Sequence, residues 1–291
     1  MPLPAFEFHE PGTVDEACRI MGELGEKTKI LAGGTDLLVN MKKKLLAPEH
    51  LVSVDRIQSL AQLDASNGTF RIGSCVKAAE IAESDATQAD FPALHEGASR
   101  LGSPLIRNLA TVGGNLVTAR PAADFPPPLM AYGATLVLKS TQGERSVPLT
   151  EFIEGPGRTV LSPNEVLEAV LLERPLPHSG SAYIKLGVRE ALEISLVNVA
   201  ALLTLNASDG AITAARVVMG SVAPTPLVSP SAEKVLKGET PSDALFLAAG
   251  EAAASDSRPI DDFRASAQYK RAMVRELTLR ALKMALSRVQ K

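Results

Sequence analysis

The chain has 291 residues, of which 45% are hydrophobic, so it holds enough apolar side chains for a large core and exceeds the usual size of a single domain. A formal net charge of −3 excludes the overall attraction to nucleic acid that a strongly basic protein has. Cys18 and Cys75, the only cysteines, lie far apart in the sequence, which disfavours both a structural zinc site and an iron–sulfur cluster in this chain.

No targeting segment or membrane span is expected. The start of the chain, MPLPAFEFHEPGT, lacks the basic region and following apolar run of a secretion signal. The longest apolar stretches, such as residues 196–205, are about half of the roughly 20 residues that a span requires. These features predict a cytoplasmic protein.

The first 57 residues are expected to form a compact unit of β-α-β type. Apolar side chains recur at helical spacing from Val14 to Leu24 and predict an amphipathic helix. Thr35 stands where an N-cap belongs, and Asp36 falls in the first turn of a second helix, which Pro48 ends. The expected strands are residues 27–32 and 50–57.

A second unit is expected from residue 58 to residue 176. Three consecutive prolines, Pro126–Pro128, mark either an irregular segment or the start of a helix, because proline does not fit a strand or a helix interior. The other expected elements are strands at residues 68–76 and 144–149 and helices at residues 77–82 and 92–98.

Pro175, Pro177 and Gly180 mark a domain boundary, so we expect one domain over residues 1–176 and another over residues 177–291. Beyond the boundary, strand-like apolar runs flank a turn at residues 208–210 and predict an antiparallel hairpin or meander. Helices are expected to complete the chain.

Two glycine pairs are the most informative feature of the sequence. Gly33-Gly34, in KILAGGTDLL, and Gly113-Gly114, in NLATVGGNLVTA, each follow a short apolar run and precede a residue that can cap or hydrogen-bond, Thr35 or Asn115. Glycine allows bare backbone N–H groups to approach an anion such as a diphosphate. Neither pair matches GxGxxG or GxxxxGK[ST], and a single pair is usually only a turn. Two pairs suggest one large nucleotide held from both sides.

Other patterns disfavour catalysis by the side chains of the protein itself. The sequence contains neither the HExxH spacing of zinc enzymes nor a GxSxG nucleophile elbow. The four histidines are scattered and are better explained as surface or capping residues: His9, His50, His95 and His178. We therefore expect no catalytic residue and no metal ligand, and a bound cofactor would perform any chemistry.

Three motifs, in this order and spacing, resemble the FAD-binding medium subunit of the molybdenum hydroxylases, a family that includes xanthine dehydrogenases and carbon monoxide dehydrogenases. The motifs are ILAGGTDLL, IRNLATVGGNLVTARPAADFPP and AYIKLGVREALEIS, and the resemblance extends over essentially the whole chain. It implies an α+β fold with a two-subdomain FAD-binding domain of the vanillyl-alcohol-oxidase type, followed by a small antiparallel sheet plus helices.

The resemblance also implies which residues bind FAD. The amides of a first flavin loop would contact the diphosphate, and this loop consists of Ile30, Leu31, Ala32, Gly33, Gly34, Thr35, Asp36 and Leu37; the second flavin loop consists of Thr111, Val112, Gly113, Gly114 and Asn115. Leu101 and Leu167 would line the flavin site, and the carboxylate of Asp124 would suit a sugar hydroxyl. Lys185 would lie near the isoalloxazine and stabilise negative charge on the reduced flavin.

By the same resemblance, the chain is an FAD-carrying oxidoreductase subunit of a heteromeric complex. A small partner would carry iron–sulfur clusters, and a large partner would carry the molybdenum cofactor. Electrons would pass from molybdenum through the clusters to FAD and then to NAD or a quinone. The chain lacks the inserted cysteine loop of 4-hydroxybenzoyl-CoA reductases, and Glu193 stands where carbon monoxide dehydrogenases have an aromatic residue, which favours the xanthine dehydrogenase pattern.

Two alternatives stay open. One is a free-standing flavin reductase of the same superfold, like the UDP-N-acetylenolpyruvoylglucosamine reductases, which would need a general acid of its own. The other is a non-catalytic nucleotide-binding or assembly protein that kept the fold and lost the flavin.

Overall fold

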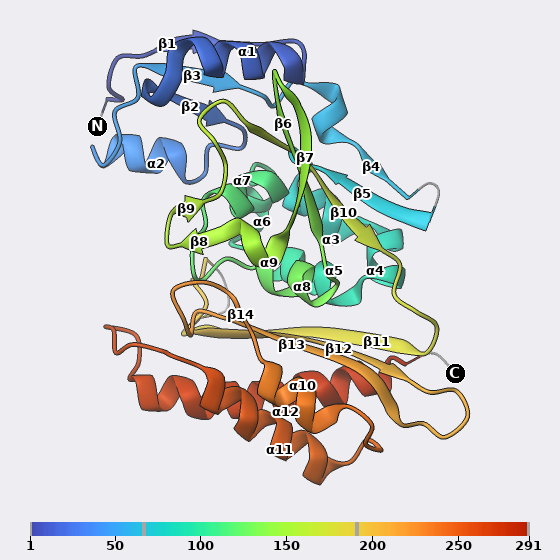
Figure 1. The fold of residues 1–291 in the computed structure, drawn as a ribbon. Coiled ribbons are helices and arrows are strands. Elements are labelled where there is room, and N and C mark those ends of the chain that lie inside the picture. Colours follow the sequence, from blue (N-terminus) through green and yellow to red (C-terminus); the bar gives the residue numbers. More distant parts are fainter. Residues whose placement is uncertain (1, 66–67, 190–191, 290–291) are drawn as a thin grey trace.

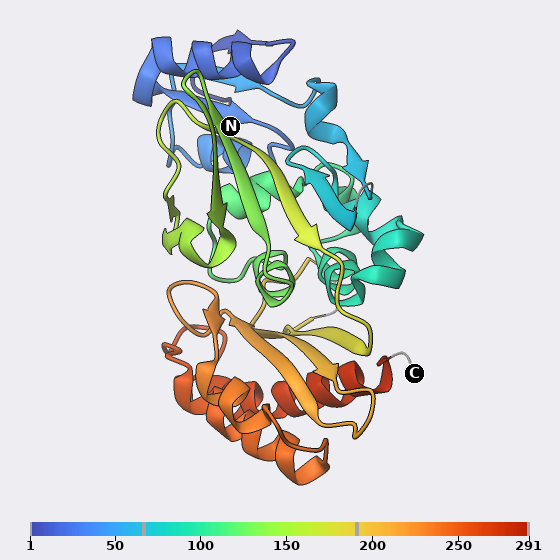
Figure 2. The ribbon, with the colours of Figure 1, turned by 45° about the vertical axis from the view of Figure 1, so that its right-hand side comes forward.

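The computed structural model describes residues 2–65, 68–189 and 192–289 (Figure 1). Its elements form three units stacked along the long axis of the molecule, and Figure 2 shows the same order from a second side. A unit with a parallel sheet lies at one end, a unit with an antiparallel sheet lies in the middle, and a second antiparallel sheet with its helices lies at the other end. This mixture of helices and largely antiparallel sheets confirms the expected α+β class.

The first sheet has three parallel strands in the order β1-β3-β2 (Glu7–His9, His50–Ser53 and Thr28–Leu31). Helix α1 (Val14–Leu24) begins where Thr13 Oγ1 accepts a hydrogen bond from the Glu16 amide, and its buried side chains pack against the sheet. A 3-10 turn (Gly25–Lys27) joins α1 to β2. The β-α-β unit is therefore confirmed, and β1 is an additional strand of three residues.

The second helix differs from expectation at both ends. Helix α2 spans Leu37–Lys42, so Asp36 rather than Thr35 is its N-cap, and no side chain caps it. The helix ends well before Pro48 because Lys44 adopts a left-handed conformation with φ of 59°, which a helix cannot continue. Its last turn carries Lys42, whose charge is favourable at that end.

The middle unit is built on a five-stranded antiparallel sheet in the order β4-β5-β10-β6-β7. These strands are Leu63–Asp64, Thr69–Gly73, Val166–Glu173, Thr135–Ser140 and Gly143–Pro148. A 3-10 helix (Gln58–Ala61) precedes β4, and a two-stranded hairpin of β8 (Ile153–Gly155) and β9 (Arg158–Thr159) precedes β10.

Short helices fill one side of the middle unit. The three prolines open α8 (Pro126–Ala131), which resolves the two expectations for them in favour of a helix start. The other helices are α3 (Ala78–Glu83), α4 (Asp85–Asp90), α5 (Pro92–Arg100), α6 (Pro104–Arg107), α7 (Val112–Val117) and α9 (Leu149–Phe152).

The C-terminal sheet confirms the expected meander. Its strands β11 (Ser179–Leu186), β12 (Val197–Leu205), β13 (Ile212–Gly220) and β14 (Leu227–Val228) are antiparallel and lie in chain order. Three helices follow: α10 (Pro230–Leu236), α11 (Asp243–Asp256) and α12 (Ala267–Ser287). Glu190 and Ala191, which follow β11 in the sequence, lie outside the described residues.

Alternation along the C-terminal strands gives the sheet two apolar faces. Ala182 and Val199 belong to the core shared with α11 and α12, whereas Tyr183, Ala200 and Val218 belong to the core of the middle unit. Successive side chains of a strand point to opposite faces, so the sheet lies between the middle unit and the C-terminal helices (Figure 2). The division into domains at residue 176 stays a prediction. None of the helices in the described ranges is long and apolar enough to cross a bilayer.

A charged cluster anchors α12 to the segment before it. Lys270 is 2% exposed, and its Nζ donates to Asp262 Oδ2 and to the Ile260 carbonyl, each at 2.9 Å. Arg264 Nη2 donates to the same carboxylate oxygen at 2.7 Å. Hydrogen bonds from Arg264 and, to a smaller extent, from Lys270 hold the pKa of Asp262 well below its ordinary value of 3.8.

Replacement of Asp262 tests this anchor. Asp262→Asn should lower the free energy of unfolding by about 3 kcal/mol at pH 7, because the buried ammonium of Lys270 loses its charged partner. Since the folded-state pKa of Asp262 is lowered, its contribution is complete above pH 3.8 and is lost as the pH falls below it. In urea unfolding over a pH series, the free energies of unfolding of wild type and Asp262→Asn should therefore converge in acid. The exposed control Glu26→Gln should leave the free energy of unfolding nearly unchanged. A difference between wild type and Asp262→Asn that stays constant in acid would contradict the assignment.

Candidate functional site

A cleft of about 280 Å³ opens between the first two units. Its walls are the loop from β2 to α2, the segment from α6 to α7, and the segment that leads into β10. Thirteen of the expected FAD-binding residues line it: Ile30, Ala32, Gly33, Gly34, Thr35, Asp36, Leu37, Leu101, Thr111, Gly113, Gly114, Asn115 and Leu167. The structure thus brings together two segments far apart in the sequence.

The first wall presents backbone donors. Among the residues that the structure describes, no acceptor binds the six successive N–H groups of residues 32–37. Gly34 has φ of 70°, which turns the chain sharply away from the end of β2. Consecutive amides around a left-handed residue form a concave anion-binding surface. This loop has the geometry expected for a diphosphate.

Gly33 brings this loop against the opposite wall. A Cβ at position 33 would lie 1.9 Å from the Leu109 carbonyl oxygen, and a Cβ at Gly34 would lie 2.9 Å from Leu38 Cδ1. Real Cβ atoms do not approach backbone oxygen so closely. Glycine at position 33 is therefore required by the close approach of two backbone segments, and glycine at position 34 by its backbone conformation.

The second glycine pair differs from expectation. It lies in the first turn of helix α7 rather than in a loop after a strand, and Thr111 is the N-cap. Gly113 N donates to the Ser74 carbonyl at 2.8 Å, and Gly114 N donates to Thr111 Oγ1 at 3.0 Å. The amides of Val112 and Asn115 also donate within the protein. The expectation of bare N–H groups at this pair is therefore wrong, because the Ser74 carbonyl and Thr111 Oγ1 accept hydrogen bonds from them.

The glycines of α7 have a packing role instead. A Cβ at Gly113 would lie 2.6 Å from Ser74 Cβ, so only glycine lets α7 rest against the end of β5. On the cleft side, Asn115 offers a side-chain oxygen, Oδ1, that is buried and has no hydrogen-bond partner among the described residues. A ligand donor in the cleft would satisfy this oxygen.

The rest of the cleft is mostly apolar. Leu101, Ile106, Leu161, Val166 and Leu167 line it. Nine lining residues were not expected from the sequence: Val54, Ser74, Cys75, Ile106, Ala110, Val117, Thr118, Leu161 and Val166. The predicted strand end at Ser74 and Cys75 was the one sequence signal available for them, because isolated apolar residues in strand ends, loops and short helices carry no mark of a cleft.

Cys75 is not a nucleophile in this cleft. Its thiol donates to the Val54 carbonyl at 3.4 Å, and burial raises the pKa of the Cys75 thiol to about 11. The thiol is therefore neutral at pH 7, and nucleophilic chemistry requires a thiolate.

Four expected residues do not line the cleft. Leu31 is the last residue of β2, and Val112 is fully buried in α7. Asp124 and Lys185 instead bind each other: Lys185 Nζ lies 2.8 Å from Asp124 Oδ2, with only 7% and 8% of the two side chains exposed. The Tyr183 hydroxyl donates to Asp124 Oδ1 at 2.7 Å. A sugar-binding role for Asp124 and a flavin-facing role for Lys185 stay predictions, and both groups have partners within the protein.

The cluster of Asp124, Tyr183 and Lys185 joins the middle unit to the C-terminal sheet. Burial raises the pKa of the Asp124 carboxyl, and the ammonium of Lys185 opposes this shift. Burial also raises the pKa of the Tyr183 hydroxyl well above its ordinary value of 10. Lys185 Nζ further donates to the Arg100 carbonyl at 3.1 Å, directly before Leu101 in the cleft wall. The cluster therefore positions one wall of the cleft from outside it.

Comparison with known proteins supplies a family context for this geometry. A family model described as "FAD binding domain in molybdopterin dehydrogenase" matches residues 4–175, and one described as "CO dehydrogenase flavoprotein C-terminal domain" matches residues 182–285. The carbon monoxide dehydrogenase medium chain of Hydrogenophaga pseudoflava is 33% identical over 98% of both chains. The xanthine dehydrogenase FAD-binding subunit of Escherichia coli O157:H7 is 31% identical over 96% of both.

A solved structure shows the same fold over the full length. It is a carbon monoxide dehydrogenase from Hydrogenophaga pseudoflava that lacks the Mo-pyranopterin moiety of its molybdenum cofactor. The superposition has a TM-score of 0.95 at 33% identity and covers 100% of both chains.

Gly34 tests the anion-binding loop. Gly34→Ala should weaken FAD binding about tenfold, because a left-handed conformation costs an L residue about 1–2 kcal/mol and the loop relaxes away from the shape that presents its amides. Equilibrium titration of the FAD-free chain with FAD measures this change. Gly210→Ala is the matched control, since Gly210 has φ of 72° in a remote turn. Equal affinities in the two variants would remove the loop from the FAD site.

A double-mutant cycle tests the Asp124–Lys185 pair. Lys185→Met should cost about 3–5 kcal/mol of unfolding free energy, because it leaves the Asp124 carboxylate buried without a charged partner. Adding Asp124→Asn should recover much of this loss, since the second uncharged side chain removes the stranded charge. Urea unfolding of the four proteins gives the coupling energy. Losses that simply add would mean that the two charges do not interact in the folded protein.

Proposed function

This chain belongs to the FAD-binding medium subunits of the molybdenum hydroxylase family, and we propose that it is the electron-transfer subunit of such an oxidoreductase. Bound FAD would accept electrons that reach it from a molybdenum site through iron–sulfur clusters on partner chains, and would pass them to an acceptor such as NAD or a quinone. The observation that carries the proposal is the run of six amides, residues 32–37, for which no described residue supplies an acceptor, in the wall of a largely apolar cleft.

The residues of the cleft fit FAD. The amides of residues 32–37 would bind its diphosphate, and Asn115 Oδ1 would accept a hydrogen bond from the cofactor. Leu101 and Leu167 would contact an apolar portion of the cofactor and exclude water from it. We propose these contacts for the thirteen expected residues that line the cleft.

A relay role agrees with the side chains in the cleft. Asp36 is the one carboxylate among the lining residues; half of its side chain is exposed, and Arg120 Nε lies 3.7 Å from it. The Cys75 thiol is neutral, and no histidine is among the lining residues. A reductase that protonates its own substrate needs a placed acid in the cleft. The cleft is therefore better suited to holding a cofactor than to acid–base work on a substrate.

The C-terminal unit would position the cofactor cleft and contact partner chains. The Asp124–Lys185 pair fixes β11 against the helix that ends in Arg100. We propose that Lys185 acts on the cofactor through this segment and the adjoining Leu101. Large molybdenum-carrying and small iron–sulfur-carrying partners would complete the enzyme.

Purification of the chain from its native source, through a tag on one end, tests the function. We expect FAD, molybdenum and iron in one assembly, because electrons can reach FAD only from clusters held nearby. Gly34→Ala should give an assembly with normal molybdenum and iron but depleted FAD. A flavin-loaded chain that purifies alone, without either metal, would instead support a free-standing reductase. A chain that neither carries nor binds FAD would support the non-catalytic alternative.

A further inference from the structure

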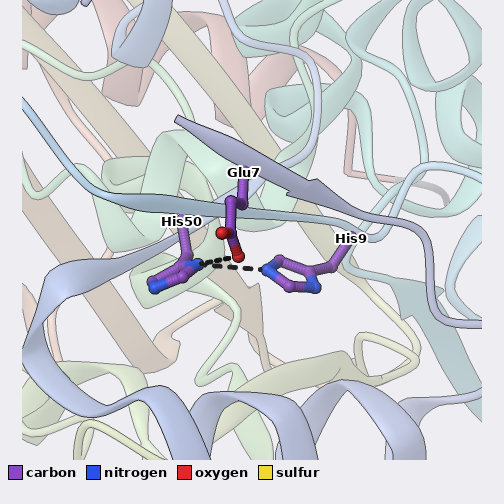
Figure 3. Close-up of side chains that lie close together, drawn as sticks. All are labelled: Glu7, His9 and His50. Carbon is purple, nitrogen blue, oxygen red and sulfur yellow. Dashed lines mark hydrogen bonds and ion pairs between the residues drawn. The ribbon is translucent and has the colours of Figure 1, made fainter. Parts of the chain in front are cut away.

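Three side chains with metal-binding atoms converge on the first sheet. Glu7 and His9 come from β1 and His50 comes from β3, and Figure 3 shows them pointing toward one another. His9 Nε2 lies 3.2 Å from His50 Nδ1, and Glu7 Oε2 lies 3.3 Å from the same nitrogen. All three candidate ligand atoms lie within 4.8 Å of one another. Two histidines that lie 41 positions apart in the sequence therefore meet in the fold.

Strand register explains the convergence. β1 and β3 are parallel, with Glu7 opposite His50 and His9 opposite Val52. Glu7 and His9 are two residues apart and so share one face of β1, and residues opposite each other in a sheet share a face. The three side chains therefore meet on one face because of the backbone pairing.

The separations suit a tetrahedral metal ion. Zinc binds imidazole nitrogen at about 2.0–2.1 Å and carboxylate oxygen at about 2.0–2.2 Å. At a tetrahedral angle, two such ligand atoms stand about 3.3–3.4 Å apart, which is close to the 3.2 and 3.3 Å observed here. Imidazole with carboxylate is a ligand set that suits Zn²⁺ and similar divalent transition metals.

We propose that Glu7, His9 and His50 form a binding site for a divalent transition metal, with Zn²⁺ as the expected ion and water as its fourth ligand. Glu7 is exposed at the molecular surface, so water reaches the fourth position. The ion would join β1, an edge strand of three residues that pairs with β3, to the rest of the sheet. Because the folded sheet assembles the ligands, the metal would stabilise the folded state.

The proposed site is separate from the FAD cleft and does not rest on the proposed function. His50 and its register partner Thr28 begin their strands, whereas the amide loop follows the last residue of β2. The strands are parallel, so His50 and the amide loop lie at opposite ends of the strands, roughly 13 Å apart along extended chain at ~3.3 Å per residue. Metal binding should therefore leave FAD binding unchanged.

Calorimetric titration of the untagged, FAD-loaded chain with Zn²⁺ tests the proposal. We expect one ion per chain. His9→Gln and His50→Gln should each lower the affinity at least about tenfold, since loss of even an outer partner of a metal ligand costs about 10–100-fold. His95→Gln, on α5 and outside the cluster, is the matched control and should bind like wild type.

Two further measurements separate a built site from loose binding. Zn²⁺ should raise the thermal midpoint of wild type and of His95→Gln but not of the other two variants, with the flavin spectrum unchanged in all four. Zinc-soaked crystals should show an anomalous peak between the three side chains. Equal zinc affinity in wild type and in a His9→Gln/His50→Gln double variant, or no binding at all, would overturn the proposal.

Discussion

The close approach of Gly33 to the Leu109 carbonyl is the contact on which the functional part of the molecule depends. It presses the loop after β2 against the segment between α6 and α7, and thereby forms two walls of one cleft from residues far apart in the chain. With the loop held there, the amides of residues 32–37 find no protein acceptor in the described structure. Unpaired donors are tolerated where water or a ligand completes them, so the packing constraint and the binding capacity arise together.

The same dipeptide serves two physical purposes in this fold. At Gly33-Gly34, glycine permits a backbone contact and a left-handed turn, and the neighbouring amides stay available to a ligand. At Gly113-Gly114, glycine lets α7 rest on Ser74, and the amides are used by the cap and by the strand end. Backbone donors open to an anion are therefore concentrated on one wall, while the other contributes shape and the Asn115 oxygen, which has no hydrogen-bond partner among the described residues.

Buried polar groups join the units at a distance from the cleft. The Asp124–Lys185 pair and the Tyr183 hydroxyl connect the middle unit to β11, and Lys185 also holds the carbonyl of Arg100. A buried charge pair is weak evidence for stability but constrains geometry when all its groups are satisfied. The wall of the cleft at Leu101 thus depends on a strand of the C-terminal sheet, which links that unit to the proposed cofactor site.

The sequence by itself determined the family and many of the local elements, but not the bounds of α2 or the helix that contains Gly113-Gly114. The spacing of apolar residues gave α1 its bounds, alternation predicted the meander, and the motifs around Gly33-Gly34 identified the wall that presents its amides. It did not determine that Asp124 pairs with Lys185, that the first amides of α7 hydrogen-bond within the protein, or that His9 contacts His50. Helical and strand periods depend on near neighbours, whereas these contacts depend on strand register and on how separate units pack. Only the tertiary structure decided them, because each joins residues whose local sequence carries no mark of the other.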